Sequence, residues 1–186
     1  WGGDIATGYA NGNSKITQSG SIFSKKSLSL TLVREDDFKK QVENYISGKT
    51  PYARGTAGMI NMAMEVWSND PRTAPIVIYQ HTWSFGGDGF VVRGDINTPS
   101  DLCNDKIIVV QAYGPHVDYV QKVLHDGCPQ GHTTKVKYVK DLTGTANSPA
   151  TAFRNDPSVS AVMVVSPDAL ALTSNGTVGT GAEDSV

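Results

Sequence analysis

Acid–base and metal chemistry in this chain would have to use its four histidines, which are His81, His116, His125 and His132. None of them lies in an HExxH motif, a His-x-His pair or a set of CxxC cysteines, the spacings typical of zinc sites. The sequence also holds no GxSxG nucleophile elbow and no GxxxxGK phosphate loop. Ser84 and Asp88 could be combined with one of the first two histidines as a triad, although their spacing does not require it. We therefore predict a protein that is not an enzyme and that binds no metal or cofactor.

More informative are hydroxyl, amide and aromatic side chains that follow predicted strands. Gln111 ends an apolar run over residues 106–111. Tyr113 and Gly114 then form the turn into a helix that opens near His116. The free N–H groups and the dipole at the start of a helix suit an anionic or carbonyl group, to which His116 could donate a hydrogen bond. The alternative is a tight strand-to-helix turn with an incidental histidine.

Two glycine-containing segments supply further candidates for ligand contact. Gly55 and Thr56 precede a predicted helix, and Thr56 could simply cap that helix. Capping and ligand contact are compatible there, because the neighbouring N–H groups stay available. Trp1, Asp4 and Tyr9 belong to a glycine-rich stretch whose small residues permit close approach of the backbone. Aromatic rings there could stack on a ligand, and the alternative is an exposed chain terminus.

The ends of two other apolar runs carry the remaining candidates. Thr82, Trp83 and Ser84 follow one run, and Trp83 could instead pack at a hinge. Ser166 and Asp168 follow the last run, and Asp168 could instead cap the next helix. Together with the groups above they predict an aromatic, hydroxyl-rich site with few fixed charges. Such a site suits a neutral or weakly anionic solute, since a strong anion site would need a committed arginine.

Alternating strands and helices would position these candidates. The predicted strands are 28–33, 75–80, 90–93, 106–111, 134–139 and 159–165. The predicted helices are 38–47, 57–67, 115–126 and 148–154, with helical turns at 98–102 and after residue 168. This alternation is typical of an α/β fold with largely parallel strands, which binds ligands beyond the carboxyl ends of those strands.

The two cysteines, Cys103 and Cys128, flank one strand–helix unit. A strand over 106–111 and a helix over 115–126 running back against it return the chain to its starting end, which would let the two thiols pair. Two separate buried thiols are the alternative. A disulfide would indicate an oxidising compartment, and closing the loop would add roughly 3 kcal/mol to the free energy of unfolding.

Composition argues against several classes of protein. The 16 Lys and Arg residues nearly balance the 18 Asp and Glu residues, giving a net charge of −2, so no basic surface for nucleic acid is expected. No apolar run approaches the roughly 20 residues of a membrane-spanning helix. No signal peptide is evident, and a chain that starts at Trp1 is expected to be processed, trimmed or incomplete.

Several short phrases occur in an order that resembles one family of binding proteins. They are 35–38 (EDDF), 41–42 (QV), 47–48 (SG), 54–56 (RGT), Met59, 80–84 (QHTWS), 101–102 (DL), 111–117 (QAYGPHV) and 161–168 (AVMVVSPD). Together they resemble the nitrate, sulfonate and thiamine-precursor branch of ABC-transporter solute-binding proteins. The likeness is greatest to a subgroup that is sometimes fused to OmpA-like envelope domains, and it spans nearly the whole chain.

The resemblance implies a two-lobed periplasmic-binding-protein (type II) fold that is incomplete in the first lobe. Residues 1–90 would form the first lobe, 91–172 the second lobe and 173–186 a Gly/Thr/Ser-rich return segment. A crossing between the lobes would lie near 85–94. The family usually has a strand before such a first segment and about 100 further residues after the last one. A missing remainder of the same chain is therefore an expected partner.

The function that the resemblance implies is capture of a small-molecule solute in the cleft between the lobes. The solute would be delivered to an ABC-transporter permease, which places the protein in the periplasm or another extracytoplasmic compartment. The alternative is a sensor or assembly module of the cell envelope that keeps the receptor fold without transport. A bound solute would distinguish transport from this alternative.

Overall fold

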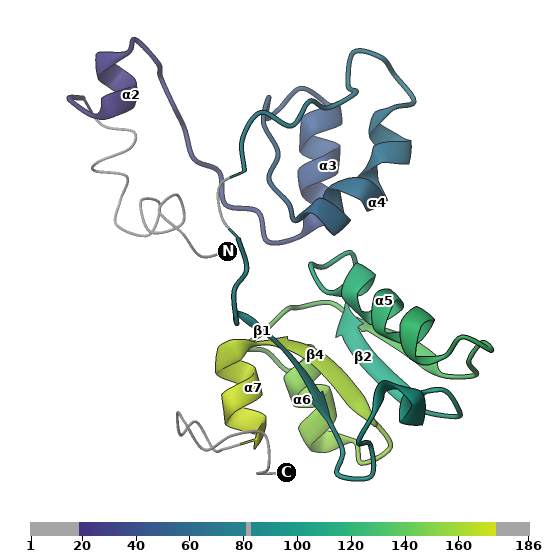
Figure 1. Cartoon of the computed structure of the whole chain (residues 1–186). Helices are drawn as coiled ribbons and strands as arrows, with labels where there is room; N and C mark the ends of the chain where they lie inside the picture. Colours follow the sequence, from purple (N-terminus) through teal and green to yellow (C-terminus); the bar gives the residue numbers. More distant parts are fainter. Residues whose placement is uncertain (1–18, 81–82, 174–186) are drawn as a thin grey trace.

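The computed structural model describes residues 19–80 and 83–173, which form a helical unit and a sheet unit (Figure 1). The helical unit contains the short helix α2 (Ile22–Lys25), then α3 (Phe38–Ile46) and α4 (Ala57–Trp67). The sheet unit begins at β1 (Asp88–Val92). The prediction of an α/β fold is confirmed by the mixed sheet and its helices, whereas the two-lobed receptor fold stays a prediction.

The sheet has four strands in the order β1-β4-β2-β3. β2 (Ile107–Gln111) is parallel to both β3 (Lys135–Val139) and β4 (Ala161–Val165), whereas β1 runs antiparallel to β4. β2 therefore has a strand on each side. Its middle residues 108–110 are buried, as expected for a parallel strand that is covered on both faces.

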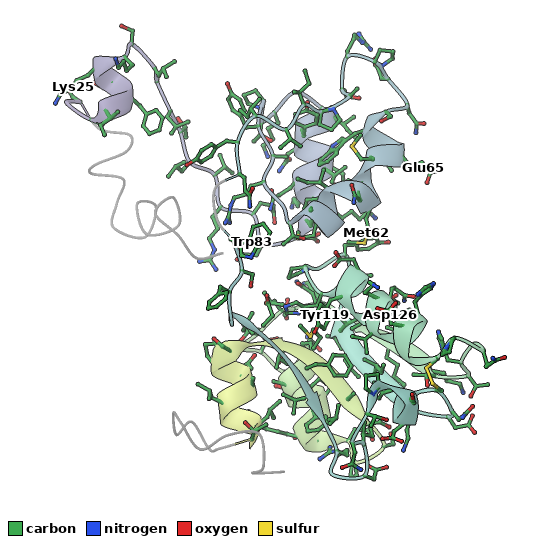
Figure 2. The ribbon with its side chains drawn as sticks, in the orientation of Figure 1. Lys25, Met62, Glu65, Trp83, Tyr119 and Asp126 are labelled. Atoms are coloured by element: carbon green, nitrogen blue, oxygen red, sulfur yellow. A yellow bond between two sulfur atoms is a disulfide. The ribbon has the colours of Figure 1, made fainter. Side chains whose placement is uncertain are left out.

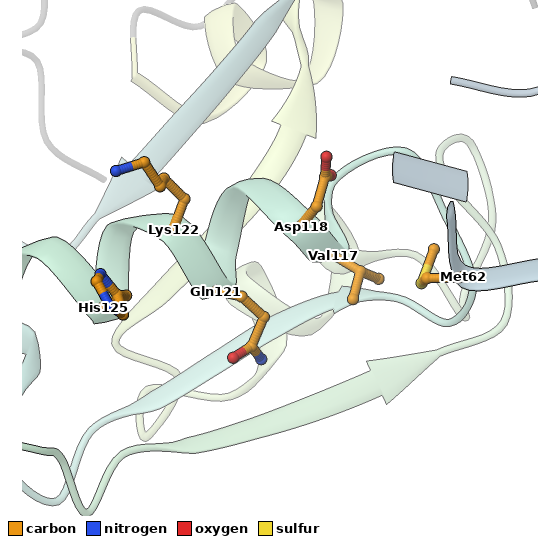
Figure 3. Close-up of a pocket in the computed structure, with 6 residues that line it drawn as sticks. All are labelled: Met62, Val117, Asp118, Gln121, Lys122 and His125. Carbon is orange, nitrogen blue, oxygen red and sulfur yellow. The ribbon is translucent and has the colours of Figure 1, made fainter. Parts of the chain in front are cut away.

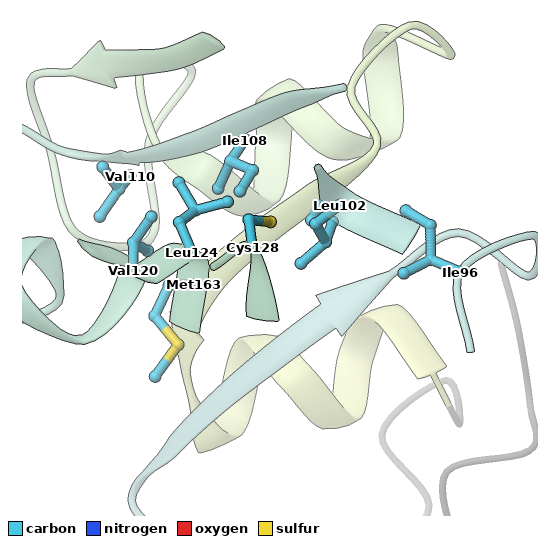
Figure 4. Packing of buried hydrophobic residues seen from close by; sticks show 9 residues of the cluster. Ile96, Leu102, Ile108, Val110, Val120, Leu124, Cys128 and Met163 are labelled. Carbon is cyan, nitrogen blue, oxygen red and sulfur yellow. The ribbon is translucent and has the colours of Figure 1, made fainter. Parts of the chain in front are cut away.

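Helices cover both faces of the sheet because successive side chains of a strand point to opposite sides. The covering helices are α5 (Val117–Gly127), α6 (Pro149–Asn155) and α7 (Ser166–Thr173). α5 packs over Ile108 and Val110 of the central strand (Figure 4). α6 and α7 pack over Val109 and Val162 on the opposite face. The apolar run of β2 is thus divided between two separate cores.

A disulfide joins Cys103 to Cys128, whose Cα atoms are 5.5 Å apart, so the predicted pairing is confirmed. Cys103 follows the 3₁₀ turn η1 (Pro99–Leu102), and Cys128 follows the last residue of α5. Gly127 lies against this turn, where a Cβ would come within 2.6 Å of the Pro99 side chain. Disulfides persist mainly in oxidising compartments, and this bridge points to such an environment.

α3 and α4 pack against each other around one small apolar cluster. Its buried members are Phe38, Val42, Met59, Ala63 and Trp67. Asp37 and Thr56 cap the two helices, because each side-chain oxygen accepts a hydrogen bond from a backbone N–H in the first turn. The rings of Phe38 and Trp67 meet edge to face with their centroids 6.1 Å apart. This single cluster is the core of the helical unit.

Two predicted strands are absent from the part of the chain that the structure describes. Residues 28–33 and 75–80 have the composition of strands, yet neither belongs to a sheet. These two predictions were wrong because a strand needs a neighbour for its backbone N–H and C=O groups, and the four-stranded sheet is built without them. The other four predicted strands are confirmed, with ends shifted by one or two residues.

Candidate functional site

One edge of the sheet collects most of the predicted site residues. The three parallel strands end there, at Gln111, Val139 and Val165. β1 begins at the same edge, because it is antiparallel to β4 and pairs Asp88 with Val165. The segments at this edge carry the candidates Ser84, Tyr113, Gly114, His116, Ser166 and Asp168. Open α/β sheets bind their ligands beyond this edge.

A chain of hydrogen bonds links the entry to β1 with the start of α5. The Nε2–H of His116 donates to Oδ1 of Asp88 over 2.8 Å, and the hydroxyl of Ser84 donates to Oδ2 over 2.5 Å. A carboxylate only accepts hydrogen bonds, so this contact fixes a proton on Nε2. The imidazole is 2% exposed, and the pair therefore holds the two segments together from inside the protein.

The environment of Asp88 keeps it ionised. Burial by itself would raise the pKa of this carboxyl group, because the charged form loses hydration. The hydrogen bonds from Ser84 and His116, together with the charge attraction of the imidazole, outweigh burial and hold the pKa below its ordinary value of 3.8. The sheet edge consequently has a fixed negative charge at neutral pH. Sequence reasoning considered Asp88 only as a triad member and missed this role.

The order of these three groups differs from that of a serine hydrolase. In a Ser-His-Asp triad the imidazole lies in the middle and takes the proton of the serine. Here the carboxylate lies in the middle, and Ser84 donates to Asp88 instead of to His116. This geometry stabilises the negative charge of Asp88 and holds the entry to β1 beside the start of α5. It provides no general base for the Ser84 hydroxyl.

Two buried polar atoms at this edge have no hydrogen-bond partner among the described residues. They are Nδ1 of His116 and Oδ2 of Asp168. An unsatisfied buried polar atom costs about 1–3 kcal/mol, so each would gain from a ligand group or a water molecule that reached it. These atoms favour a polar group as part of whatever binds at the edge.

The turn after β2 has a special backbone conformation. Tyr113 lies in the left-handed region with φ of +53°, which non-glycine residues rarely adopt. At Gly114 a Cβ would come within 2.5 Å of the Gln111 side-chain oxygen, so the turn requires glycine there. The Gln111 amide donates to the carbonyl of Lys140 over 3.2 Å and holds the turn beside β3. The ring of Tyr113 stays exposed and accessible to a ligand.

Gly55 and Thr56 lie at the amino end of α4 and not at the sheet edge. The hydroxyl of Thr56 accepts from the N–H of Met59 over 3.2 Å, which confirms the capping alternative. Gly55 packs against Phe38, and a Cβ on it would lie 3.0 Å from the ring. Both residues therefore have structural roles in the helical unit.

Ser166 and Asp168 belong to the start of α7, and Trp83 lies in the segment that joins the two units (Figure 2). The N–H of Ser166 donates to the carbonyl of Gly87 over 2.8 Å. Asp168 lies inside the first turn of α7 instead of capping it, where a negative charge is favourable. Trp83 is 79% exposed, so the alternative of hinge packing was wrong for this structure.

An open groove of about 570 Å³ lies between α4 and α5 (Figure 3). Met62 lines it from α4, and the lining residues on α5 are Val117, Asp118, Gln121, Lys122 and His125. Gly58 lets the helices approach closely, since a Cβ there would come within 2.2 Å of the Asp118 carboxylate. Sequence reasoning missed this groove, because neither helix alone indicates which face meets the other.

The remaining candidates, Trp1, Asp4, Tyr9 and Thr82, lie outside the described residues. No protein-family model matches the chain, and no curated protein or solved structure matches it significantly. Within residues 19–80 and 83–173, no three His, Cys, Asp or Glu side chains are grouped so that they could hold a metal ion. None of the helices there has the length and apolar character needed to cross a bilayer. The geometry of the sheet edge is therefore the main guide to function.

Proposed function

We propose that this chain is part of a solute-binding receptor that captures a small molecule and catalyses no reaction. The observation that carries the proposal is the convergence of two segments at the carboxyl edge of the sheet: the start of β1 with Asp88, and the turn between β2 and α5 with Tyr113 and His116. Doubly wound α/β proteins bind their ligands at this place. The solute would lie between this edge and the helical unit, where the α4–α5 groove opens.

The groups at the edge suit a neutral or weakly anionic solute. The exposed rings of Tyr113 and Trp83 offer flat surfaces for stacking. The amino end of α5 offers backbone N–H groups to a carbonyl or carboxylate oxygen. Nε2 of His116 already donates to Asp88, so the buried Nδ1 is the ring nitrogen that is left to contact the solute. This contact favours a solute with a polar group at that position.

Capture would work by closure of the two units on the solute. Residues 83–87 join the units, and Gly58 touches Asp118 where α4 approaches α5. A solute that contacts both units shifts the equilibrium between the open and closed forms. The size of the shift is set by the difference between its affinities for the two forms. An ABC-transporter permease or a fused envelope domain would then recognise the closed form. A periplasmic location belongs to this proposal and agrees with the disulfide.

Native mass spectrometry of the gently purified chain, compared with its denatured mass, tests the proposal. We expect an additional small-molecule mass that disappears on denaturation and identifies the solute. A chain that is intact and empty, and whose melting temperature is unchanged by a panel of small organic solutes, would contradict solute capture. The envelope sensor or assembly module would then be the better hypothesis.

The position of the site can be tested with two tyrosines of similar exposure. Tyr113→Ala should weaken solute binding by more than about 1 kcal/mol, because it removes a stacking surface at the edge. Tyr138→Ala, on an exposed position of β3, serves as the matched control and should leave affinity unchanged. Calorimetric titration of both folded variants measures the difference. Equal affinities in the wild type and both variants would show that the solute binds elsewhere.

A further inference from the structure

The short helix α2 is closed at both ends by its own residues. The hydroxyl of Ser21 accepts a hydrogen bond from the N–H of Ser24 over 3.1 Å and caps the first turn. At the other end Ser27 lies in the left-handed region with φ of +58°, and the N–H of Leu28 donates to the carbonyl of Phe23 over 2.9 Å. This pattern is a Schellman motif, which turns the chain back toward the helix and brings Leu28 next to Phe23.

The apolar side chains of this closed turn are exposed. Ile22 is 74% exposed, Leu28 57% and Phe23 37%, and no residue of α2 is buried. Figure 1 shows α2 at the end of an extended link, away from α3 and α4. We call Ile22, Phe23 and Leu28 the apolar tip. Apolar side chains that a regular turn holds in water indicate a binding surface, because their solvation is unfavourable.

Two lysines accompany the apolar tip. Lys25 and Lys26 are exposed, and neither forms an ion pair with any residue that the structure describes. In the sequence no Asp or Glu occurs from Ile5 to Arg34. Lysines beside exposed apolar side chains are typical of segments that bind anionic lipid headgroups.

The backbone of the turn is suited to an interface that holds little water. The N–H groups of residues 24–28 all donate to oxygen atoms within residues 21–24. A segment that satisfies its own N–H groups leaves few of them unpaired when it enters a lipid interface. A polypeptide that paired with the turn as a strand would need those N–H groups, which are already used. The occupant that fits the turn is therefore a lipid surface.

We propose that residues 21–28 dock on the surface of a membrane that contains anionic lipids. The apolar tip reaches the boundary between headgroups and acyl chains, and Lys25 and Lys26 contact the lipid phosphates. So few groups make a reversible anchor. Docking is independent of solute capture, because residues 21–28 belong neither to the sheet edge nor to the α4–α5 groove.

Flotation of the full chain with lipid vesicles tests the proposal. The chain should bind vesicles made of equal parts phosphatidylcholine and phosphatidylglycerol. It should bind vesicles of phosphatidylcholine alone at least about tenfold more weakly, because these carry no net charge. Added salt should release the chain from the anionic vesicles. Equal binding to both kinds of vesicle would overturn the proposal, as would binding to neither, which would leave a protein as the occupant of the apolar tip.

A pair of isoleucine variants locates the apolar contact. Ile22→Ser should weaken binding to the anionic vesicles at least about fivefold, since it removes a large apolar side chain from the tip. Ile76→Ser changes another exposed isoleucine, at 84% exposure, and should leave binding unchanged. Both positions are exposed, so both variants should fold. Binding that Ile22→Ser leaves intact would overturn the proposal.

A pair of lysine variants separates docking from general charge attraction. Replacing Lys25 and Lys26 together by glutamine should weaken binding to the anionic vesicles at least about tenfold. The same replacement of Lys39 and Lys40, two neighbouring exposed lysines of α3, serves as the matched control and should have little effect. Equal losses in the two double variants would mean that charge anywhere on the surface attracts the chain, and docking through residues 21–28 would be wrong.

Discussion

β2 and the segment over residues 75–80 have the same kind of sequence and opposite surroundings. β2 contains Ile-Ile-Val-Val over 107–110 and lies between two strands, with helices on both faces. Residues 76–79 contain Ile-Val-Ile-Tyr and are exposed on both sides. Composition therefore gives a segment the capacity to form a strand, and the neighbouring segments determine whether the strand forms.

The same contrast extends to the two units as wholes. The sheet unit has two apolar cores and a disulfide, whereas the helical unit has one core of five buried side chains. Local stability follows the amount of apolar surface that is buried, so the helical unit should open at a lower free energy than the sheet unit. The predictions below test this difference, beginning with the largest effect.

Truncation of one large side chain in the sheet unit should have the largest effect. Phe153 is buried between α6 and the sheet, and the guanidinium of Arg93 lies 3.8 Å from its ring centroid. Phe153→Ala should lower the free energy of unfolding by about 3–5 kcal/mol. Ile78→Ala removes an exposed side chain from the second strand-like run and should change it by less than about 0.5 kcal/mol.

Urea unfolding followed by far-ultraviolet circular dichroism measures the free energy of unfolding of both variants. An unchanged denaturant slope would show that the two variants unfold from comparable states. Similar losses of stability in Phe153→Ala and Ile78→Ala would mean that residues 75–80 are buried in the monomer. The contrast between the two strand-like runs would then be lost.

Removal of the disulfide should have the next largest effect on the free energy of unfolding. The loss of stability should be confined to the sheet unit. Replacing Cys103 and Cys128 by serine removes a link across 25 residues and should cost roughly 3 kcal/mol. Trp67 is buried in the helical unit and reports on that unit alone. In the double variant, the circular dichroism signal should be lost at a lower temperature than in the wild type. The temperature at which hydrogen exchange around Trp67 accelerates should stay the same. Equal shifts in both would show that the units unfold as one.

Local patterns predicted those features that depend on neighbouring residues in the sequence. The strand–helix unit of β2 and α5 predicted that Cys103 lies next to Cys128, and the position of Thr56 before an apolar periodic stretch predicted a helix cap. Each of these features is determined within a few turns or one strand–helix unit. The amino-acid sequence of such a unit therefore carried enough information to predict it.

Features that depend on the order of the strands could not be predicted in this way. The contact between Asp88 and His116 joins residues 28 positions apart, and it forms only because β1 is antiparallel to β4 and starts where β2 ends. The direction of the Gln111 amide toward Lys140 depends in the same way on the position of β3. Patterns along the chain locate strand ends, but they do not determine which side chains meet across a sheet.

Neutralising the Asp88 carboxylate should have a smaller, pH-dependent effect on the free energy of unfolding. The pKa of Asp88 is lower in the folded protein than its ordinary value of 3.8. Its contribution to stability is therefore complete above that value and is lost as the pH falls through the lower, folded pKa. Asp88→Asn should reduce the free energy of unfolding at pH 7 by about 1 kcal/mol.

The difference between wild type and Asp88→Asn isolates this group from the other carboxyl groups that titrate at low pH. We expect the difference to shrink as the pH is lowered from 5 toward 2 (measured by urea unfolding at each pH). Ser84→Ala removes one of the two hydrogen bonds and should show the same trend with a smaller amplitude. A difference that stays constant over this range would mean that Asp88 has the same pKa in the folded and unfolded states.

A change at the contact between the two units should have the smallest effect on the free energy of unfolding. Gly58 lies in the first turn of α4, where alanine would normally stabilise the helix by about 0.5–1 kcal/mol. Its Cβ would come within 2.2 Å of the Asp118 carboxylate on α5, so the two helices would have to move apart or Asp118 would have to turn away. We therefore expect Gly58→Ala to bring no gain in stability.

A double-mutant cycle with Asp118→Ala separates this contact from the helix propensity of alanine. In the Asp118→Ala background the clash is absent, and Gly58→Ala should raise the free energy of unfolding, giving a coupling of about 0.5–1 kcal/mol. The same coupling should appear in the affinity for solute, because α4 and α5 approach each other when the units close. A coupling of zero in stability would mean that the helical and sheet units do not touch in solution and that each owes its stability to its own core.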